Sequence, residues 1–252
     1  MEISYKKVAR FMPVNEETTL RKIFWKSRYK SIKQSLSLLE NNSNYKYGIT
    51  DLTIDNLSEF STLYQEEINK KFNPKIYDIV SIYKEKLKNK ELLYFGYIWE
   101  NDQLIAGYIF NQKISREKTT LAGGIKMGKD IYIWKSPILY LLEYLFFDFW
   151  IRNNIQQFSA GKDRNCYGYL GESIWLVVHK LQNHYLPYPS SEETLFYVKE
   201  YEINPNCLIF WTKWDIDRIC SEATLWINKN WDEEELVNLL RKRGISLSIN
   251  IL

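Results

Sequence analysis

Hydrophobic residues between positions 55 and 88 recur every three or four residues, which is the period of an amphipathic helix. One series follows Asp55 and a second follows Pro74. Their apolar positions are Leu57, Phe60, Tyr64 and Ile68, then Ile76, Ile79, Val80, Tyr83 and Leu87. The pattern predicts two consecutive helices that each bury one face.

After residue 91 the pattern changes to that of strands. Residues 92–99 and 103–112 are apolar, aromatic runs separated by Glu100-Asn101-Asp102, which suits a tight hairpin turn. Shorter strands are expected at residues 119–122 and 131–134. Two helices that lead into an antiparallel hairpin indicate an α+β fold.

A long apolar helix is expected next, because Ser136 and Pro137 supply an N-cap and a first-turn proline for a segment that ends at Arg152. Residues 156–160 predict a short strand, and the polar, glycine-containing residues 161–168 predict a loop. Ser173 is expected to cap a further helix. Its apolar face is Ile174, Val177, Val178 and Leu181, with Trp175, His179 and Gln182 on the other side.

The chain begins with a weakly alternating strand pattern at residues 2–10, and residues 17–40 predict one basic helix that ends at an asparagine-rich segment. Near the other end, a helix that stops at Gly244 is followed by strict alternation over residues 245–252. Strands are expected before that helix at 195–202, 208–212 and 224–228. The last of them, the helix and the final strand form a small β-α-β unit.

These elements predict three divisions of the chain. Residues 1–50 form a basic strand and helix packed on the core, residues 51–202 form the core, and residues 203–252 contain the β-α-β unit. The expected fold class is α+β (α/β), with a mixed, mostly antiparallel sheet flanked by helices.

Composition and charge indicate the class of protein and its cellular compartment. Hydrophobic residues make up 45% and charged residues 26% of the 252, as in a soluble globular protein. The cysteines are odd in number and lack CxxC spacing, which suggests a cytoplasmic protein. We expect no membrane span, because no apolar run is long enough, and no metal site, because the histidines and cysteines lack metal-ligand spacing. Residues 1–35 carry nine Lys or Arg and three Glu, although the whole chain is only +3. This segment is either a solvated helix face or a docking site for an acidic partner.

Three stretches, in this order, resemble the GNAT superfamily of N-acyltransferases: "DQLIAGYIF", "SPILYLLEYLFFDFWIRNNIQQFSAG" and "SIWLVVHKLQNHYLPYP". The last is similar to the branch that contains Fem-like and peptide-modifying enzymes. The likeness extends from about Leu52 to Tyr188 and implies transfer of an acyl group from a thioester to an amine. It also implies that Tyr108, in the hairpin, binds substrate.

The donor site departs from the family pattern. Many GNAT proteins carry Q/R-x-x-G-x-G/A before the long helix to bind the pyrophosphate of coenzyme A, whereas this chain has "AGGIKMGKDIYIWKSP". Lys135 and the helix start at Ser136 still offer charge and free amides to a phosphate. The resemblance adds Arg164 and Asn165, from the polar loop where the donor enters. Acyl-CoA, an acyl carrier protein and aminoacyl-tRNA all remain possible donors.

Amine acylation needs a base for the amine proton and donors for the developing oxyanion. His179 titrates near neutrality and is a candidate base, with Asp163 as another and Tyr167 as an acid for the leaving thiolate. Glu143 interrupts an apolar helix and is either a base or that helix's exposed edge. Trp134 and Trp175 belong to an aromatic group that forms either the core or a channel for a longer acyl chain. The other members of this group are Phe146, Phe147, Phe149 and Trp150.

The sequence therefore predicts an N-acyltransferase that acts on a primary amine of a peptide or a small metabolite, with an acidic leader peptide or a carrier protein as possible partners and no role in DNA binding. Two alternatives stay open. One is a Fem-like transferase that uses aminoacyl-tRNA, and the other is a degenerate GNAT fold that binds without catalysis.

Overall fold

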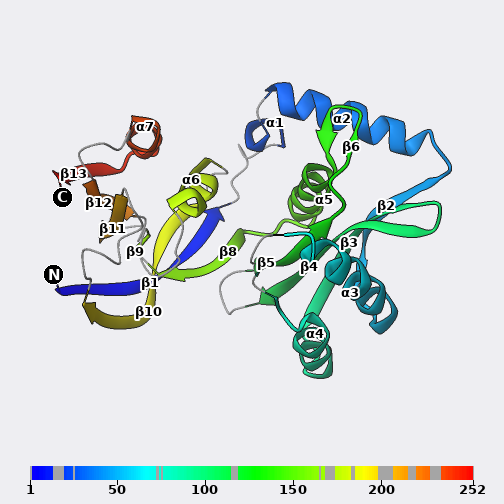
Figure 1. The fold of residues 1–252 in the computed structure, drawn as a ribbon, viewed down its shortest axis with the longest axis horizontal. Coiled ribbons are helices and arrows are strands. Elements are labelled where there is room, and N and C mark those ends of the chain that lie inside the picture. Colours follow the sequence, from blue (N-terminus) through cyan, green and yellow to red (C-terminus); the bar gives the residue numbers. More distant parts are fainter. Residues whose placement is uncertain are drawn as a thin grey trace. The chain divides into compact units, whose positions relative to one another are not determined.

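The protein consists of two compact units, formed by residues 1–12 with 159–252 and by residues 13–158 (Figure 1). The computed structural model describes residues 2–13, 20–24, 26–71, 74, 76–114, 119–164, 166–167, 174–182, 185–197, 207–214, 220–227 and 234–251. The unit of residues 13–158 is the second unit below, and the other is the first unit.

An antiparallel sheet forms the centre of the second unit. Its strands β2 (Tyr45–Asp51), β3 (Leu92–Glu100), β4 (Gln103–Ile114) and β5 (Thr119–Gly128) lie in the order β5-β4-β3-β2. The β3–β4 turn is made by Asn101 and Asp102, both at positive φ (48° and 60°), as the two-residue hairpin requires. The predicted hairpin is thus confirmed, whereas β2 was missed because Gly48 interrupts its short apolar pattern.

Helices cover both faces of this sheet. On one face, α3 (Ile54–Ile68) and α4 (Ile79–Lys88) bury an apolar cluster that includes Phe60, Tyr83 and Phe95. Thr53 caps α3 in a capping box with Asn56, and Asp78 caps α4. Ile76 precedes α4 and is exposed, so the predicted helix after Pro74 starts later than its pattern indicated.

On the other face lies α5 (Ile138–Arg152), whose rings form an aromatic core with the sheet. The rings of Phe146 and Phe158 are 4.4 Å apart between centroids, and those of Phe147 and Trp150 are 5.6 Å apart. All four side chains are buried. Of the two interpretations of the aromatic residues, these rings support the core.

Two helices near the N-terminus lie against α5 and the neighbouring hairpin. The predicted helix over residues 17–40 is two helices among the described residues, α1 (Leu20–Ile23) and α2 (Lys26–Glu40), with a bend at Phe24. Phe24 is buried and packs edge-on against Phe147, 5.7 Å between centroids, so burial of this ring fixes the bend. The hairpin is formed by β6 (Tyr132–Ile133) and β7 (Ser136–Pro137).

The start of α5 corrects one prediction. Pro137 occupies the N-cap position without a side-chain cap bond, and Ser136 lies in β7. Ser136 is buried, and its hydroxyl is bonded to that of Ser31 at 2.9 Å instead of to the helix amides.

The first unit contains the predicted β-α-β closure. Strands β12 (Cys220–Ile227) and β13 (Ser246–Ile251) are parallel and are joined by α7 (Glu234–Lys242), which stops before Gly244 at φ 72°. β11 (Cys207–Trp214) pairs with β12, and α6 (Ile174–Gln182) contributes to the same apolar core. The α+β fold class with this closing unit is confirmed.

Strand β1 (Glu2–Pro13) of the first unit pairs antiparallel with β10 (Leu186–Tyr197). β8 (Gln157–Arg164) is longer than predicted, and β9 is Cys166–Tyr167. Part of the polar segment predicted as a loop is therefore strand. Of the strand predicted at 195–202, residues 198–202 lie outside the described residues.

Among the described residues, no helix combines the length and the apolar character needed to cross a membrane.

Candidate functional site

A buried tyrosine on β4 marks the candidate site. Tyr108 packs its ring against Phe110 and Phe146, at 5.6 Å and 5.1 Å between centroids. Its hydroxyl lies so close to Gly123 that a Cβ there would be 2.5 Å away. Within the described part of the chain, this hydroxyl has no hydrogen-bond partner. Buried hydroxyls are normally bonded, so this donor is one that the described residues leave unsatisfied.

The strand opposite Tyr108 contains a β-bulge. Tyr108 pairs with Lys126 and Phe110 pairs with Gly123, so that two residues, Gly124 and Ile125, face Ile109. The amide of Ile125 leaves the ladder and donates to the hydroxyl of Tyr83 at 3.2 Å. Bulges re-aim side chains and backbone amides, and this one places two phenols near one point of β5.

Glycine is required at the bulge because neighbouring atoms approach the backbone closely. A Cβ on Gly124 would lie 2.3 Å from the Tyr83 hydroxyl and 2.6 Å from the carbonyl oxygen of Ile109. The local sequence "AGG" therefore permits the contact between α4 and β5 that holds Tyr83 in place.

An ion pair lies next to Tyr108. Lys126 of β5 donates to the carboxylate of Glu143 on α5, and their side chains are only 25% and 18% exposed. In each of the other three described ion pairs at least one partner is more than 60% exposed. The Lys126 ammonium also sits 5.9 Å from the centre of the Tyr108 ring. We call Tyr83, Tyr108, Lys126 and Glu143 the bulge cluster.

Burial determines the protonation of the two phenols. It raises the pKa of Tyr108 far above the usual value of 10, and the Glu143 carboxylate, together with Tyr83 once that phenol is ionised, acts in the same direction. Burial also raises the pKa of Tyr83, against a smaller opposing effect of the Ile125 amide. Both hydroxyls therefore keep their protons at neutral pH and act as hydrogen-bond donors.

The bulge cluster thus combines neutral donors with a carboxylate in a mostly dry environment. A carbonyl oxygen can accept from the Tyr108 hydroxyl, and the Glu143 carboxylate can accept a proton from an amine. Electrostatic interactions are stronger here than in water, because the aromatic core on one side excludes solvent.

Three predicted residues, Trp134, Lys135 and Ser136, make no described contact with the bulge cluster. Trp134 is at positive φ (56°) in the β6–β7 turn and is 58% exposed. The Lys135 ammonium lies 5.7 Å from the centre of the Trp134 ring. The hydroxyl of Ser136 is bonded to that of Ser31. Because its side chain is exposed, Trp134 does not join the aromatic core.

The remaining predicted residues belong to the first unit. The backbone of Asp163 and Arg164 lies in β8, that of Tyr167 in β9, and that of Trp175 and His179 in α6. Their side chains, and Asn165 entirely, lie outside the described residues. Their proposed roles stay predictions.

Sequence reasoning gave little weight to two members of the bulge cluster. Glu143 interrupts an apolar run in the sequence, but an exposed helix edge was the favoured explanation. Tyr83 looked like an ordinary core position of α4. The register of β4 and β5 pairs Tyr108 with Lys126, which binds Glu143, and forms the bulge whose Ile125 amide donates to Tyr83.

No family model matches the chain, and no curated protein matches it. The solved structures it is similar to include L-PGS from Bacillus licheniformis, with 13% identity and a TM-score of 0.41 over 64% of this chain and 48% of that one. The C-terminal domain of a putative lysylphosphatidylglycerol synthetase from Agrobacterium fabrum has 9% identity and a TM-score of 0.40, over 72% of this chain and 52% of that one.

A GCN5-related N-acetyltransferase from Anabaena variabilis gives 14% identity and a TM-score of 0.37, over 77% of this chain and 38% of that one. The chain thus spans about half or less of the length of these three structures. They include a member of the superfamily that the sequence resembles and give no support to the Fem branch in particular. Because these TM-scores are below 0.5, we infer no activity from them.

Proposed function

We propose that this protein is an N-acyltransferase that moves an acyl group from a thioester to a primary amine. The observation that carries the proposal is the buried hydroxyl of Tyr108, which no described residue bonds, beside the Lys126–Glu143 ion pair. A hydroxyl donor and a shielded carboxylate are the two groups that amine acylation needs from a protein.

In the proposed reaction the amine nitrogen attacks the thioester carbonyl, and a C–N bond forms as the C–S bond breaks. Tyr108 donates a hydrogen bond to the carbonyl oxygen while negative charge develops there. Glu143 takes the proton that the amine loses, and the thiolate takes up a proton from solvent. Because its pKa is raised, Tyr108 stabilises the oxyanion without giving up its own proton.

The donor proposed first is acyl-CoA, with an acyl carrier protein as the alternative thioester. Lys129 and Lys135 precede the start of α5 in the sequence, where Pro137 supplies no side-chain cap and the helix dipole favours a phosphate. Lys129 already donates to Gln103 at 2.9 Å, so of these two lysines Lys135 is the better candidate for a phosphate contact.

The acyl group proposed is short. The rings of Phe146, Phe147 and Trp150 were candidates for the wall of a long acyl channel, but they are buried against one another. The proposed acceptor is a primary amine of a peptide or a small metabolite.

The first test is thermal denaturation with free coenzyme A, acetyl-CoA and longer acyl-CoAs, because a ligand that binds only the folded state raises its stability. We expect the largest rise with a short acyl-CoA, and a smaller rise for Tyr108→Phe. Tyr94→Phe is the matched control, because its hydroxyl is already bonded to Gln112 at 3.0 Å. A protein that responds to none of these thioesters would favour an aminoacyl-tRNA donor or a non-catalytic fold.

A further inference from the structure

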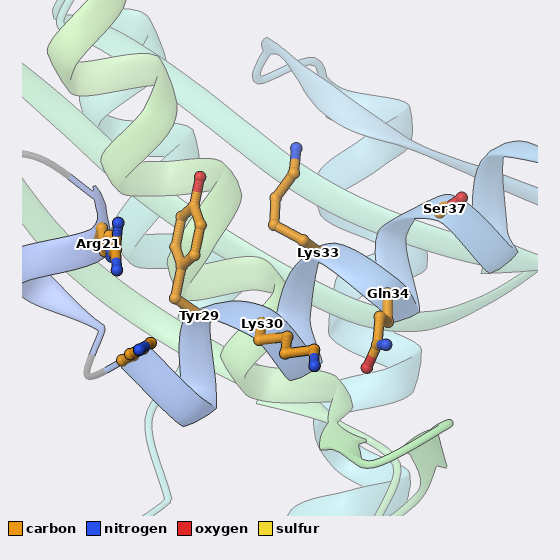
Figure 2. Close-up of a pocket in the computed structure, with 7 residues that line it drawn as sticks. Arg21, Tyr29, Lys30, Lys33, Gln34 and Ser37 are labelled. Atoms are coloured by element: carbon orange, nitrogen blue, oxygen red, sulfur yellow. The ribbon is translucent and has the colours of Figure 1, made fainter.

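A basic groove runs along α2, on the second unit. Its cavity has a volume of about 470 Å³. The residues that line it are Arg21, Lys26, Tyr29, Lys30, Lys33, Gln34 and Ser37. Figure 2 shows Tyr29 and Lys33 pointing the same way from the helix, with Lys30 and Gln34 on its other flank. We call this set the α2 groove.

The described residues do not neutralise the cations of the α2 groove. Among the described residues, none of its four Lys and Arg side chains forms an ion pair, and no acidic residue lines the cavity. Lys26 and Lys30 are four residues apart, and Lys30 and Lys33 are three apart, spacings at which like charges on a helix repel. The first turn of α2 also lacks an acidic residue to offset the helix dipole. This arrangement costs stability unless an anion binds.

The groove is held in a fixed position by the opposite face of α2. Ile32, Leu36 and Leu39 are buried there. The hydroxyl of Ser35 donates to the carbonyl of Ile133 at 2.6 Å, which ties the helix to the β6–β7 hairpin. A ligand therefore meets cations whose backbone is already ordered, which lowers the entropy cost of binding.

We propose that the α2 groove binds an extended, acidic peptide segment. The rise of 1.5 Å per residue separates Lys26 from Lys30 by about 6 Å along the helix, close to the roughly 6.6 Å between alternate side chains of an extended peptide. The lining side chains from Lys26 to Ser37 span about 16 Å, which suits a chain better than a single phosphate group. Three of the four cations are lysines, which act as point charges rather than as forks shaped for phosphate.

The neutral side chains of the groove fit the same occupant. Gln34 and Ser37 are exposed and can bond to a peptide backbone, while the ring of Tyr29 offers an apolar contact between the charges. The α2 groove and the bulge cluster share no residue, so this inference does not depend on acyl transfer.

The test is binding of a fluorescent peptide with acidic residues at alternate positions, measured by anisotropy with the full chain. Lys26→Ala, Lys30→Ala and Lys33→Ala combined should weaken binding about tenfold, because each exposed ion pair contributes a modest amount. The matched control combines Lys84→Ala, Lys86→Ala and Lys88→Ala on α4, which removes the same charge from another helix. It should bind like the wild type.

Three results would overturn the proposal. One is equal loss of binding in the two triple variants, which would mean attraction by net charge alone. Another is tighter binding of a single-stranded RNA of the same length, lost in the α2 variant, which would make the groove a nucleic-acid site. The third is binding of phosphatidylglycerol vesicles that the acidic peptide does not displace, which would make the groove a lipid-binding surface. Circular dichroism checks that both variants keep the helix content of the wild type. None of these readouts depends on catalysis.

Discussion

The bulge cluster and the α2 groove are two concentrations of charge that the protein treats in opposite ways. Lys126 and Glu143 neutralise each other in a mostly buried place against an aromatic core. The cations of the α2 groove lie in solvent, near one another, and the described residues offer them no counter-charge.

This difference separates two kinds of function. A buried pair is expensive to desolvate and makes strong, directed interactions, which suits chemistry on a small group. Exposed cations that repel one another each reduce the stability of the fold only slightly. They attract an anionic partner over a long range, which suits docking of an acidic partner. We expect mutations in the bulge cluster to change catalysis, and mutations in the α2 groove to change binding without changing catalysis.

The largest effect is expected from Glu143→Gln. Loss of the carboxylate should lower the rate of acyl transfer by about 10²–10⁴-fold, the usual contribution of a general base. Asp148→Asn on the same helix is the control, because Asp148 pairs with the exposed Arg152 at 2.8 Å. Release of free thiol from acetyl-CoA with an amine present measures the rate.

Unfolding could also explain a loss of activity in Glu143→Gln, because it leaves Lys126 without its partner. A double variant with Lys126→Met removes both charges and should regain stability without regaining activity. Recovery of activity in the double variant would mean that the carboxylate only supports the fold.

Tyr108→Phe should reduce kcat by about 10²–10³-fold, the effect of removing one donor to an oxyanion. The ring and its packing on Phe146 are kept, so the melting temperature should change little. Tyr94→Phe, which removes a bonded hydroxyl from the same face of the sheet, should keep its activity. Equal activity of the two variants would exclude Tyr108 from the reaction.

Gly124→Ala tests the bulge that organises the cluster. The new methyl group would meet the Ile109 carbonyl, which cannot move like a side-chain end, so we expect about 1–3 kcal/mol of destabilisation. Gly96→Ala is the control, since a Cβ there meets its nearest atom at 3.8 Å. Urea unfolding of the two variants measures the difference, and equal stability would contradict the tight contact.

The raised pKa of Tyr108 predicts an alkaline dependence of stability. A tyrosine whose pKa is higher in the folded state than the usual 10 stabilises the fold fully below pH 10. This contribution is lost as pH rises above 10, because the unfolded chain ionises first. Tyr108→Phe should therefore lose less stability than the wild type between pH 10 and 11 in urea titrations. Parallel curves would place the hydroxyl in contact with solvent.

The smallest effect is expected from Lys30→Ala in the α2 groove. Removal of an exposed charge should change the free energy of unfolding by less than about 0.5 kcal/mol. The sign should be stabilising at low salt, because repulsion by Lys26 and Lys33 is relieved. A clear loss of stability would show that Lys30 has a structural role. It would contradict the view that the cations of the α2 groove do not stabilise the fold.

Much of the fold followed from the sequence, because periodicity reports which face of an element is buried. The β3–β4 hairpin, α5 and the β-α-β closure all have long apolar patterns and clear end signals such as Gly244. The single helix predicted over residues 17–40 failed because the bend at Phe24 is set by packing against α5, which no local pattern shows.

The candidate site followed from the sequence only in part. Tyr108 was selected from the resemblance of the hairpin. The surroundings of its hydroxyl are set by the bulge, which depends on the pairing of β4 with β5. Glu143 and Lys126 are 17 positions apart on different elements. Local patterns of charge and hydrophobicity carry no signal for such a pair.

The most direct measurement is isotope-edited infrared spectroscopy of acetyl-CoA labelled with ¹³C at the thioester carbonyl and bound to the protein. We predict that the carbonyl stretch moves to lower frequency in the wild type and in Tyr94→Phe, and returns toward its position in water-free solvent in Tyr108→Phe. The same frequency in the wild type and Tyr108→Phe, or no bound thioester at all, would contradict the assignment of the bulge cluster to acyl transfer.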